Sequence, residues 1–176
     1  MRTKPNIQTA KKLLAGIYGD TDFGRIHAYL AESDEKMKLT APENFGMEFL
    51  AVRLAIATLS WQNLCAAAGF TDEAETKLFL KAVMEGFQSP KFKDLAVQYG
   101  EYLYGEYDGD GSSDLSPGSV PVVALSRRFF ERLKLGLLSE KTGGPDVISE
   151  SFRKMVDVLE GFRSEFETQL LEELGS

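Results

Sequence analysis

Apolar residues recur along most of this chain at intervals of three and four positions, the spacing that places side chains on one face of an α-helix. No stretch alternates between apolar and polar residues convincingly enough to indicate a β-strand. The pattern therefore predicts an all-α fold, a single-domain bundle of about six helices that spans residues 1–176. We expect the helices over about residues 7–31, 41–69, 71–87, 91–107, 121–138 and from 148 onward.

The helix at about 42–69 is expected to lie at the centre of the bundle. Apolar residues fill two of its faces, which indicates burial on more than one side. Pro42 suits a first helical turn, because its missing N–H would have no partner there, and Gly69 is expected to end the helix. Residues 49–70 are long enough to cross a bilayer. However, Arg53 and later polar residues interrupt the apolar run, so we expect no membrane span.

The helix from 148 onward has the clearest pattern. Its apolar residues alternate steps of four and three over nearly three heptads, at Ile148, Phe152, Met155, Leu159, Phe162 and Phe166. The opposite face is charged. A heptad seam of this kind either packs into the core of its own chain or joins two copies of the chain.

Several polar stretches lie between these helices. Residues 32–40 are predicted to form a connection, and residues 1–6, 108–119 and 172–176 are predicted to be flexible. The stretch 108–119, the aspartate loop, offers oxygen ligands at Asp108, Asp110, Ser112 and Asp114. These match the front half of a calcium loop, but Ser113 replaces the expected glycine and Ser119 the bidentate glutamate. We favour a linker, and calcium or another divalent cation would bind it only weakly.

Four polar or amphipathic residues interrupt the central helix, namely Arg53, Trp61, Gln62 and Asn63. Buried polar groups need hydrogen-bond partners, so this group predicts either a core network or the lining of a ligand cavity. Glu48 and Glu85 are plausible partners for Arg53.

The tyrosines of the helix at 91–107 cannot share one face, because successive residues turn by about a hundred degrees. Tyr99 is expected to point inward. A partner interface is therefore a hypothesis for Tyr102, Tyr104 and Tyr107, and cover by another part of the chain is the alternative.

Basic residues cluster further along, at Arg127, Arg128, Arg132 and Lys134. Arg128 and Arg132 share a helix face. The cluster is predicted to be a solvated face paired with Glu131 or with acids elsewhere, and the alternative is a site for an anion or an acidic partner.

The overall charge and the scarcity of certain residues narrow the chemistry. The net charge of -7 argues against nucleic acid as a main partner. His27 is the only histidine and Cys65 the only cysteine, too few for a diiron centre or a zinc site built from these residues. No pair of acids has a spacing that marks it as catalytic, so an enzyme is not favoured. We expect no cofactor beyond the weak cation, and a cytoplasmic location.

Together these features favour a helical module for protein–protein interaction, an adaptor or regulator that binds a protein partner or a second copy of itself. Two alternatives remain open. One is a bundle that holds a small, largely apolar ligand beside the central helix. The other is a protein that binds a divalent cation weakly through the aspartate loop.

Overall fold

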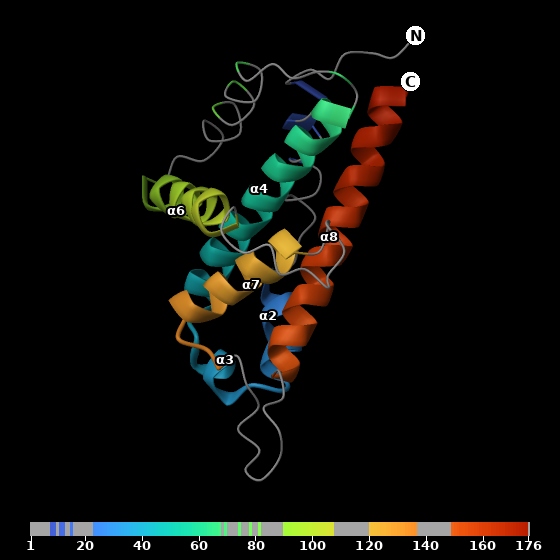
Figure 1. Cartoon of the computed structure of the whole chain (residues 1–176). Coiled ribbons are helices and arrows are strands. Elements are labelled where there is room, and N and C mark those ends of the chain that lie inside the picture. The colour runs from blue at the N-terminus through green and yellow to red at the C-terminus, as the bar shows by residue number, and fades with distance from the viewer. Residues whose placement is uncertain are drawn as a thin grey trace.

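The protein is described by a computed structural model, which covers residues 8–9, 11–12, 15, 23–67, 69, 74, 78, 81, 90–107, 120–136 and 149–175. Within these residues the chain forms helices and no strand, which confirms the predicted all-α bundle (Figure 1). The helices are α2 (Phe23–Ala31), α3 (Glu35–Leu39), α4 (Pro42–Ala67), α6 (Pro90–Tyr107), α7 (Val120–Arg132) and α8 (Glu150–Gly175). The helix predicted over 71–87 lies almost wholly outside the described residues.

Helix α4 is the central element, as predicted. It packs against α2, α6, α7 and α8 (Figure 1), and buried side chains cover several of its faces, among them Phe45, Phe49, Val52, Ile56 and Trp61. No described helix combines the length and the apolar character that crossing a bilayer would need.

Aromatic side chains form much of the core between α4, α7 and α8. The ring centroid of Phe45 lies 5.5 Å from that of Phe49, and 5.6 Å from that of Phe129 in an edge-to-face contact. Phe130 meets Phe152 of α8 edge to face at 5.3 Å. Such pairs stabilise by about 0.5–1.5 kcal/mol each beyond the burial of their area, so these rings join three helices into one core.

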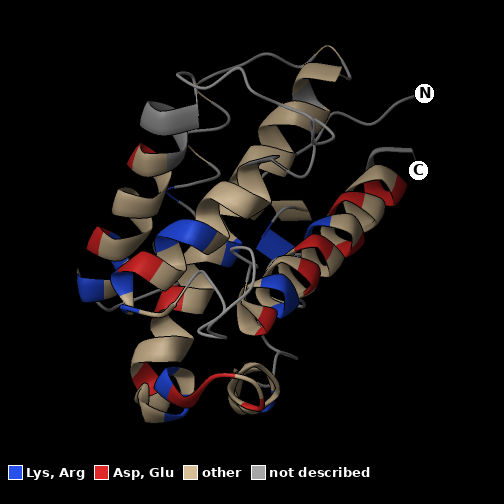
Figure 2. Cartoon of the chain, turned by 60° about the horizontal axis from the view of Figure 1, so that its bottom comes forward, with Lys and Arg blue, Asp and Glu red and all other residues tan. Residues whose placement is uncertain are grey.

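The heptad seam of α8 faces the interior of its own chain. Its described members are all buried, and the pattern continues to one further residue: Phe152, Met155, Leu159, Phe162, Phe166 and Leu170. Their partners are α4 and α7, against which α8 packs. Basic and acidic residues are spread along α8, and acidic residues predominate toward its C-terminal end (Figure 2). The described part of the seam therefore packs into the core of its own chain, which is one of the two alternatives that its pattern left open.

The polar run at 32–40 contains a helix, α3, where only a connection was predicted. Asp34 is its N-cap, and its Oδ1 accepts hydrogen bonds from the backbone N–H groups of Lys36 at 2.9 Å and Met37 at 3.2 Å. Met37 is fully buried, and His27 contacts its carbonyl oxygen at 2.8 Å through Nε2. A single buried residue in a polar run leaves no apolar periodicity to detect.

Helix α7 ends at Arg132, earlier than the predicted end near 138. Lys134 adopts a left-handed conformation with φ 56°. The N–H of Leu135 donates to the Phe130 carbonyl at 2.8 Å, and the N–H of Lys134 donates to the Glu131 carbonyl at 3.1 Å. This is the hydrogen-bond pattern of a Schellman C-cap, which usually has glycine at the left-handed position. Because a lysine occupies that position instead, the helix end could not be recognised from the residue types.

Candidate binding cleft between α4, α6 and α7

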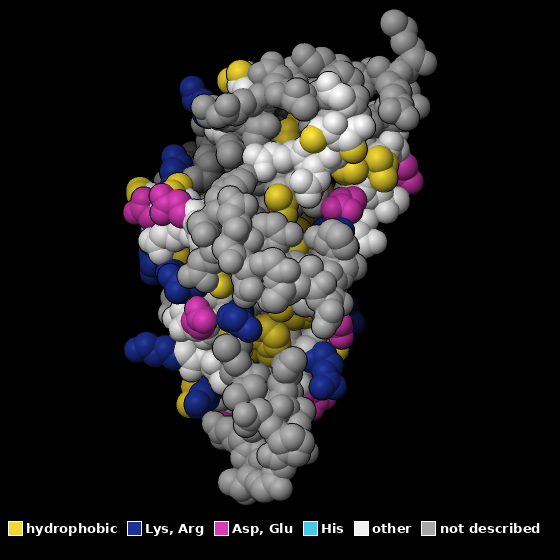
Figure 3. Space-filling view, in the orientation of Figure 1, with side chains coloured by type: hydrophobic (Ala, Val, Ile, Leu, Met, Phe, Trp, Pro, Cys, Tyr) yellow, Lys and Arg dark blue, Asp and Glu magenta, His cyan; other side chains and the backbone are white. Residues whose placement is uncertain are grey.

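Three helices that are distant in sequence line an open cleft of about 450 Å³. Its apolar lining comes from Met47, Leu95 and Leu133. Its polar lining comes from Asn44, Glu48, Lys91, Asp94, Gln98 and Arg132. Basic and acidic side chains are likewise interspersed along the side of the molecule where α6 and α7 lie (Figure 3). The cleft thus combines apolar contact area with charges of both signs.

At the wall of the cleft, a buried tyrosine holds a nearly buried carboxylate. The hydroxyl of Tyr99 in α6 donates a hydrogen bond to Glu48 Oε2 in α4 at 2.5 Å. Tyr99 is fully buried, and the Glu48 side chain is only 12% exposed. Burial raises the pKa of the Tyr99 phenol far above its usual range, and the neighbouring Glu48 carboxylate raises it further. Tyr99 therefore remains a protonated donor under all ordinary conditions.

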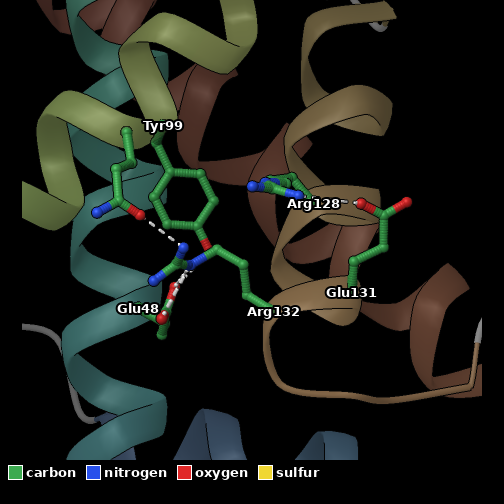
Figure 4. A network of polar contacts seen from close by, with 6 residues as sticks. Glu48, Tyr99, Arg128, Glu131 and Arg132 are labelled. Carbon is green, nitrogen blue, oxygen red and sulfur yellow. Dashed lines mark hydrogen bonds and ion pairs between the residues drawn. The ribbon is translucent and has the colours of Figure 1, made fainter.

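The same carboxylate binds a basic residue from the third helix. Arg132 Nε donates to both Glu48 oxygens, at 3.1 Å to Oε1 and 3.0 Å to Oε2, and Arg132 Nη1 donates to Gln98 Oε1 at 2.7 Å (Figure 4). The hydrogen bond to Glu48 is the main reason that the pKa of Arg132 is raised above its usual value. Its guanidinium carbon also lies 5.7 Å from the centroid of the Tyr99 ring. Glu48, Tyr99, Gln98 and Arg132 form what we call the arginine network.

The arginine network fixes the position of Arg132 before any partner is present. The early C-cap places Arg132 in the last turn of α7, where the negative end of the helix dipole favours a cation. Breaking a fully buried ion pair costs about 3–5 kcal/mol. We expect less here, because a quarter of the Arg132 side chain is exposed and solvent screens the pair. A side chain held this way loses little freedom when a ligand binds to it.

Two of the other predicted basic and tyrosine residues, Arg128 in α7 and Tyr102 in α6, contact each other. Arg128 stacks over Tyr102, with its guanidinium carbon 5.4 Å from the ring centroid, and pairs with Glu131 at 3.6 Å. Tyr102 is partly buried against the core. The side chains of Tyr104 and Tyr107, though both residues belong to α6, lie outside the described part of the structure.

The four residues of the central polar group do not form one buried cluster. Arg53 and Trp61 are buried, with the Arg53 guanidinium carbon 4.2 Å from the Phe162 ring centroid. Gln62 is only partly buried, and Asn63 is exposed. The reason is helical geometry, since each residue turns about a hundred degrees from the one before. Glu48, expected as a partner of Arg53, binds Tyr99 and Arg132 instead, and Glu85 lies outside the described residues.

A second, small cavity of about 30 Å³ lies where α4 meets α8, and exposed Asn63 lines it. Ser60 Oγ donates to Glu167 Oε1 at 2.9 Å. Arg163 binds Glu167 at 3.0 Å and Glu160 at 2.8 Å. The cavity is about the size of one water molecule. The Ser60–Glu167 hydrogen bond joins the two helices, and the ion pairs of Arg163 lie within α8.

The predicted cation ligands Asp108, Asp110, Ser112 and Asp114 lie outside the described residues. Among the residues that the structure does describe, no three His, Cys, Asp or Glu side chains gather as a metal site would require.

Comparisons with known proteins identify no family, since no protein-family model, curated protein or solved structure matches this chain. The arginine network is therefore interpreted from its own geometry. Tyr99 was predicted to point inward, Glu48 was a candidate partner of Arg53, and Arg132 belonged to the predicted basic cluster. No pattern in the sequence predicts that these three residues meet, because Tyr99 lies 51 positions and Arg132 lies 84 positions after Glu48.

Proposed function

We propose that this chain is a helical interaction module, and that the cleft between α4, α6 and α7 binds a segment of a protein partner. The observation that supports this most is the arginine network, which holds a partly exposed cation rigidly beside apolar side chains. Arginine with neighbouring apolar surface is a frequent combination at protein interfaces.

The composition of the cleft favours a peptide segment over a small apolar ligand. Glu48 and Arg132 line the cleft together with Lys91 and Asp94. An apolar molecule would cover these charges without satisfying them, at a cost in desolvation. A peptide supplies backbone donors and acceptors along with side chains that fit Met47, and it does not need to be enclosed.

The test is selection of binding peptides from a random library by the full chain, followed by titration of each with labelled protein. We expect peptides that bind the wild-type chain and lose at least tenfold in affinity when Asn44→Trp fills the cleft. Asn44 is exposed, so the change leaves the core intact. The matched control is Glu165→Trp, which adds the same ring to the exposed face of α8 and leaves affinity unchanged.

Two results would overturn the proposal. One is a library from which no peptide binds the wild-type chain specifically. The other is a set of peptides whose affinity is the same for the wild-type, Asn44→Trp and Glu165→Trp chains.

A further inference from the structure

The binding chemistry of Arg132 is only partly used within the described residues. A guanidinium carries five N–H groups in a planar fork. The bonds to Glu48 and Gln98 occupy the Nε–H and one N–H of Nη1. Three N–H groups therefore remain on a side chain that lines the cleft and is 25% exposed.

The negative charge of Glu48 is offset by its ion pair with Arg132. Its two oxygens accept from the Tyr99 hydroxyl and from Arg132 Nε. Arg132 thus binds the Glu48 carboxylate through Nε and also lines the cleft. This arrangement suits a second acceptor with negative charge, because charge-assisted hydrogen bonds from arginine are stronger than neutral ones.

The first turn of α6 adds one charge of each sign to the same cleft. Lys91 directly follows Pro90, where α6 begins, and the positive end of the helix dipole reinforces its charge. Asp94 lies three residues later and also lines the cleft. Both residues are exposed. Because Lys91 and Asp94 carry opposite charges, the cleft suits a ligand group with a single negative charge. Asp94 repels a doubly charged group such as phosphate more strongly.

We infer that the cleft recognises a carboxylate of its partner segment. The Nη N–H groups of Arg132 that remain after its bonds to the described residues bind this carboxylate, while Lys91 attracts it and Asp94 limits its affinity. This inference rests on the proposed function. The carboxylate belongs either to an aspartate or glutamate side chain or to a chain terminus, and both present the same group to a guanidinium.

The experiment uses the peptides selected by the full chain. Each acidic residue is replaced in turn by its amide, and each peptide is made with a free and with an amidated C-terminus. We expect one of these changes to weaken binding by about tenfold or more, the effect of losing a charge-assisted hydrogen bond. The change that weakens binding shows whether the recognised carboxylate belongs to a side chain or to the C-terminus of the peptide.

Two exposed variants test the inference without disturbing the arginine network. Lys91→Gln is expected to weaken binding of the same peptides by roughly two- to fivefold, and Asp94→Asn to strengthen it by a similar factor. Both effects should shrink as salt is added. Arg132→Gln, checked for folding by circular dichroism, should abolish the preference for the acidic peptide over its amide.

The outcomes separate the two proposals. Some peptides could bind more weakly to the Asn44→Trp chain yet bind equally well as acids and as amides. That result would contradict the inference that the cleft recognises a carboxylate, but it would leave the proposed interaction module unaffected. Weaker binding to Asp94→Asn would also overturn it, since the sign of the electrostatic effect would be wrong. Failure to select any peptide for the cleft would overturn both proposals.

Discussion

Tyr99 in α6 and Glu48 in α4 share a hydrogen bond of 2.5 Å in which a fully buried phenol donates to a nearly buried carboxylate. The same carboxylate receives Arg132 from α7. One glutamate therefore connects three helices, and its tyrosine partner is the part of the connection that has no contact with solvent.

Replacement of Tyr99 by phenylalanine removes this donor and leaves the ring in place. We expect Tyr99→Phe to lower the free energy of unfolding by about 1–3 kcal/mol, because a buried charged acceptor loses a hydrogen bond. Urea unfolding of the two proteins measures the difference. Tyr29→Phe is the control, since Tyr29 is 44% exposed, and a change below about 0.5 kcal/mol is expected there. Equal stability of Tyr99→Phe and wild type would contradict the role given to this bond.

The raised pKa of Tyr99 makes stability depend on pH in the alkaline range. The phenol is protonated in the folded protein at pH values where an unfolded tyrosine, with a pKa of about 10, has lost its proton. The contribution of the protonated Tyr99 phenol to the free energy of unfolding is therefore fully present below pH 10 and is lost as the pH rises above 10. Wild-type stability should thus fall more steeply than that of Tyr99→Phe, by a difference approaching about 1.4 kcal/mol per pH unit. Parallel slopes in urea unfolding above pH 10 would contradict this.

The C-cap of α7 predicts a stabilising substitution. Lys134 occupies a left-handed conformation that costs a side chain about 1–2 kcal/mol and costs glycine almost nothing. After the greater freedom of glycine in the unfolded chain is allowed for, Lys134→Gly should raise the free energy of unfolding by roughly 0.5–1 kcal/mol. Thermal unfolding measures it. Arg127→Gly, within the same helix and exposed, should instead destabilise by about 1 kcal/mol. Destabilisation by both changes would show that Lys134 is not strained.

The inward position of the heptad seam also has a measurable consequence. Leu159 is fully buried, so Leu159→Ala should cost about 2–5 kcal/mol. Leu171 lies on the same helix and is 54% exposed, so Leu171→Ala should cost less than about 1 kcal/mol. Chemical denaturation of the two variants provides the comparison. Near-wild-type stability of Leu159→Ala would mean that the seam awaits a partner after all.

Periodicity alone predicted the parts of the fold that bury whole helix faces. The two apolar faces of α4 and the alternating steps of α8 need many apolar residues in register, and such a pattern is visible in one sequence. Helix α3 was missed because its stability comes from the Asp34 cap and one buried methionine. The end of α7 was missed because a lysine stands where glycine is usual.

The candidate site could not be predicted in the same way. Its hydrogen bonds join Glu48 to Tyr99 and Arg132, which lie on two other helices. The apolar periodicity of one helix does not show how the neighbouring helices are oriented against it. The four residues predicted as a polar group on α4 were those that interrupt an apolar run. Glu48 interrupts it too, yet only the packed structure shows which side of α4 faces α6 and α7.

The cap of α3 ties two distant parts of the chain into one local unit. While Oδ1 of Asp34 caps α3, its Oδ2 accepts a hydrogen bond of 2.9 Å from Ser151, in the first turn of α8. A helix of five residues does not persist alone in water. Any fluctuation that withdraws the start of α8 therefore also releases the cap. Hydrogen exchange should report this as one event, in which the amides of Lys36 and Met37 open at the rate at which the first turn of α8 detaches.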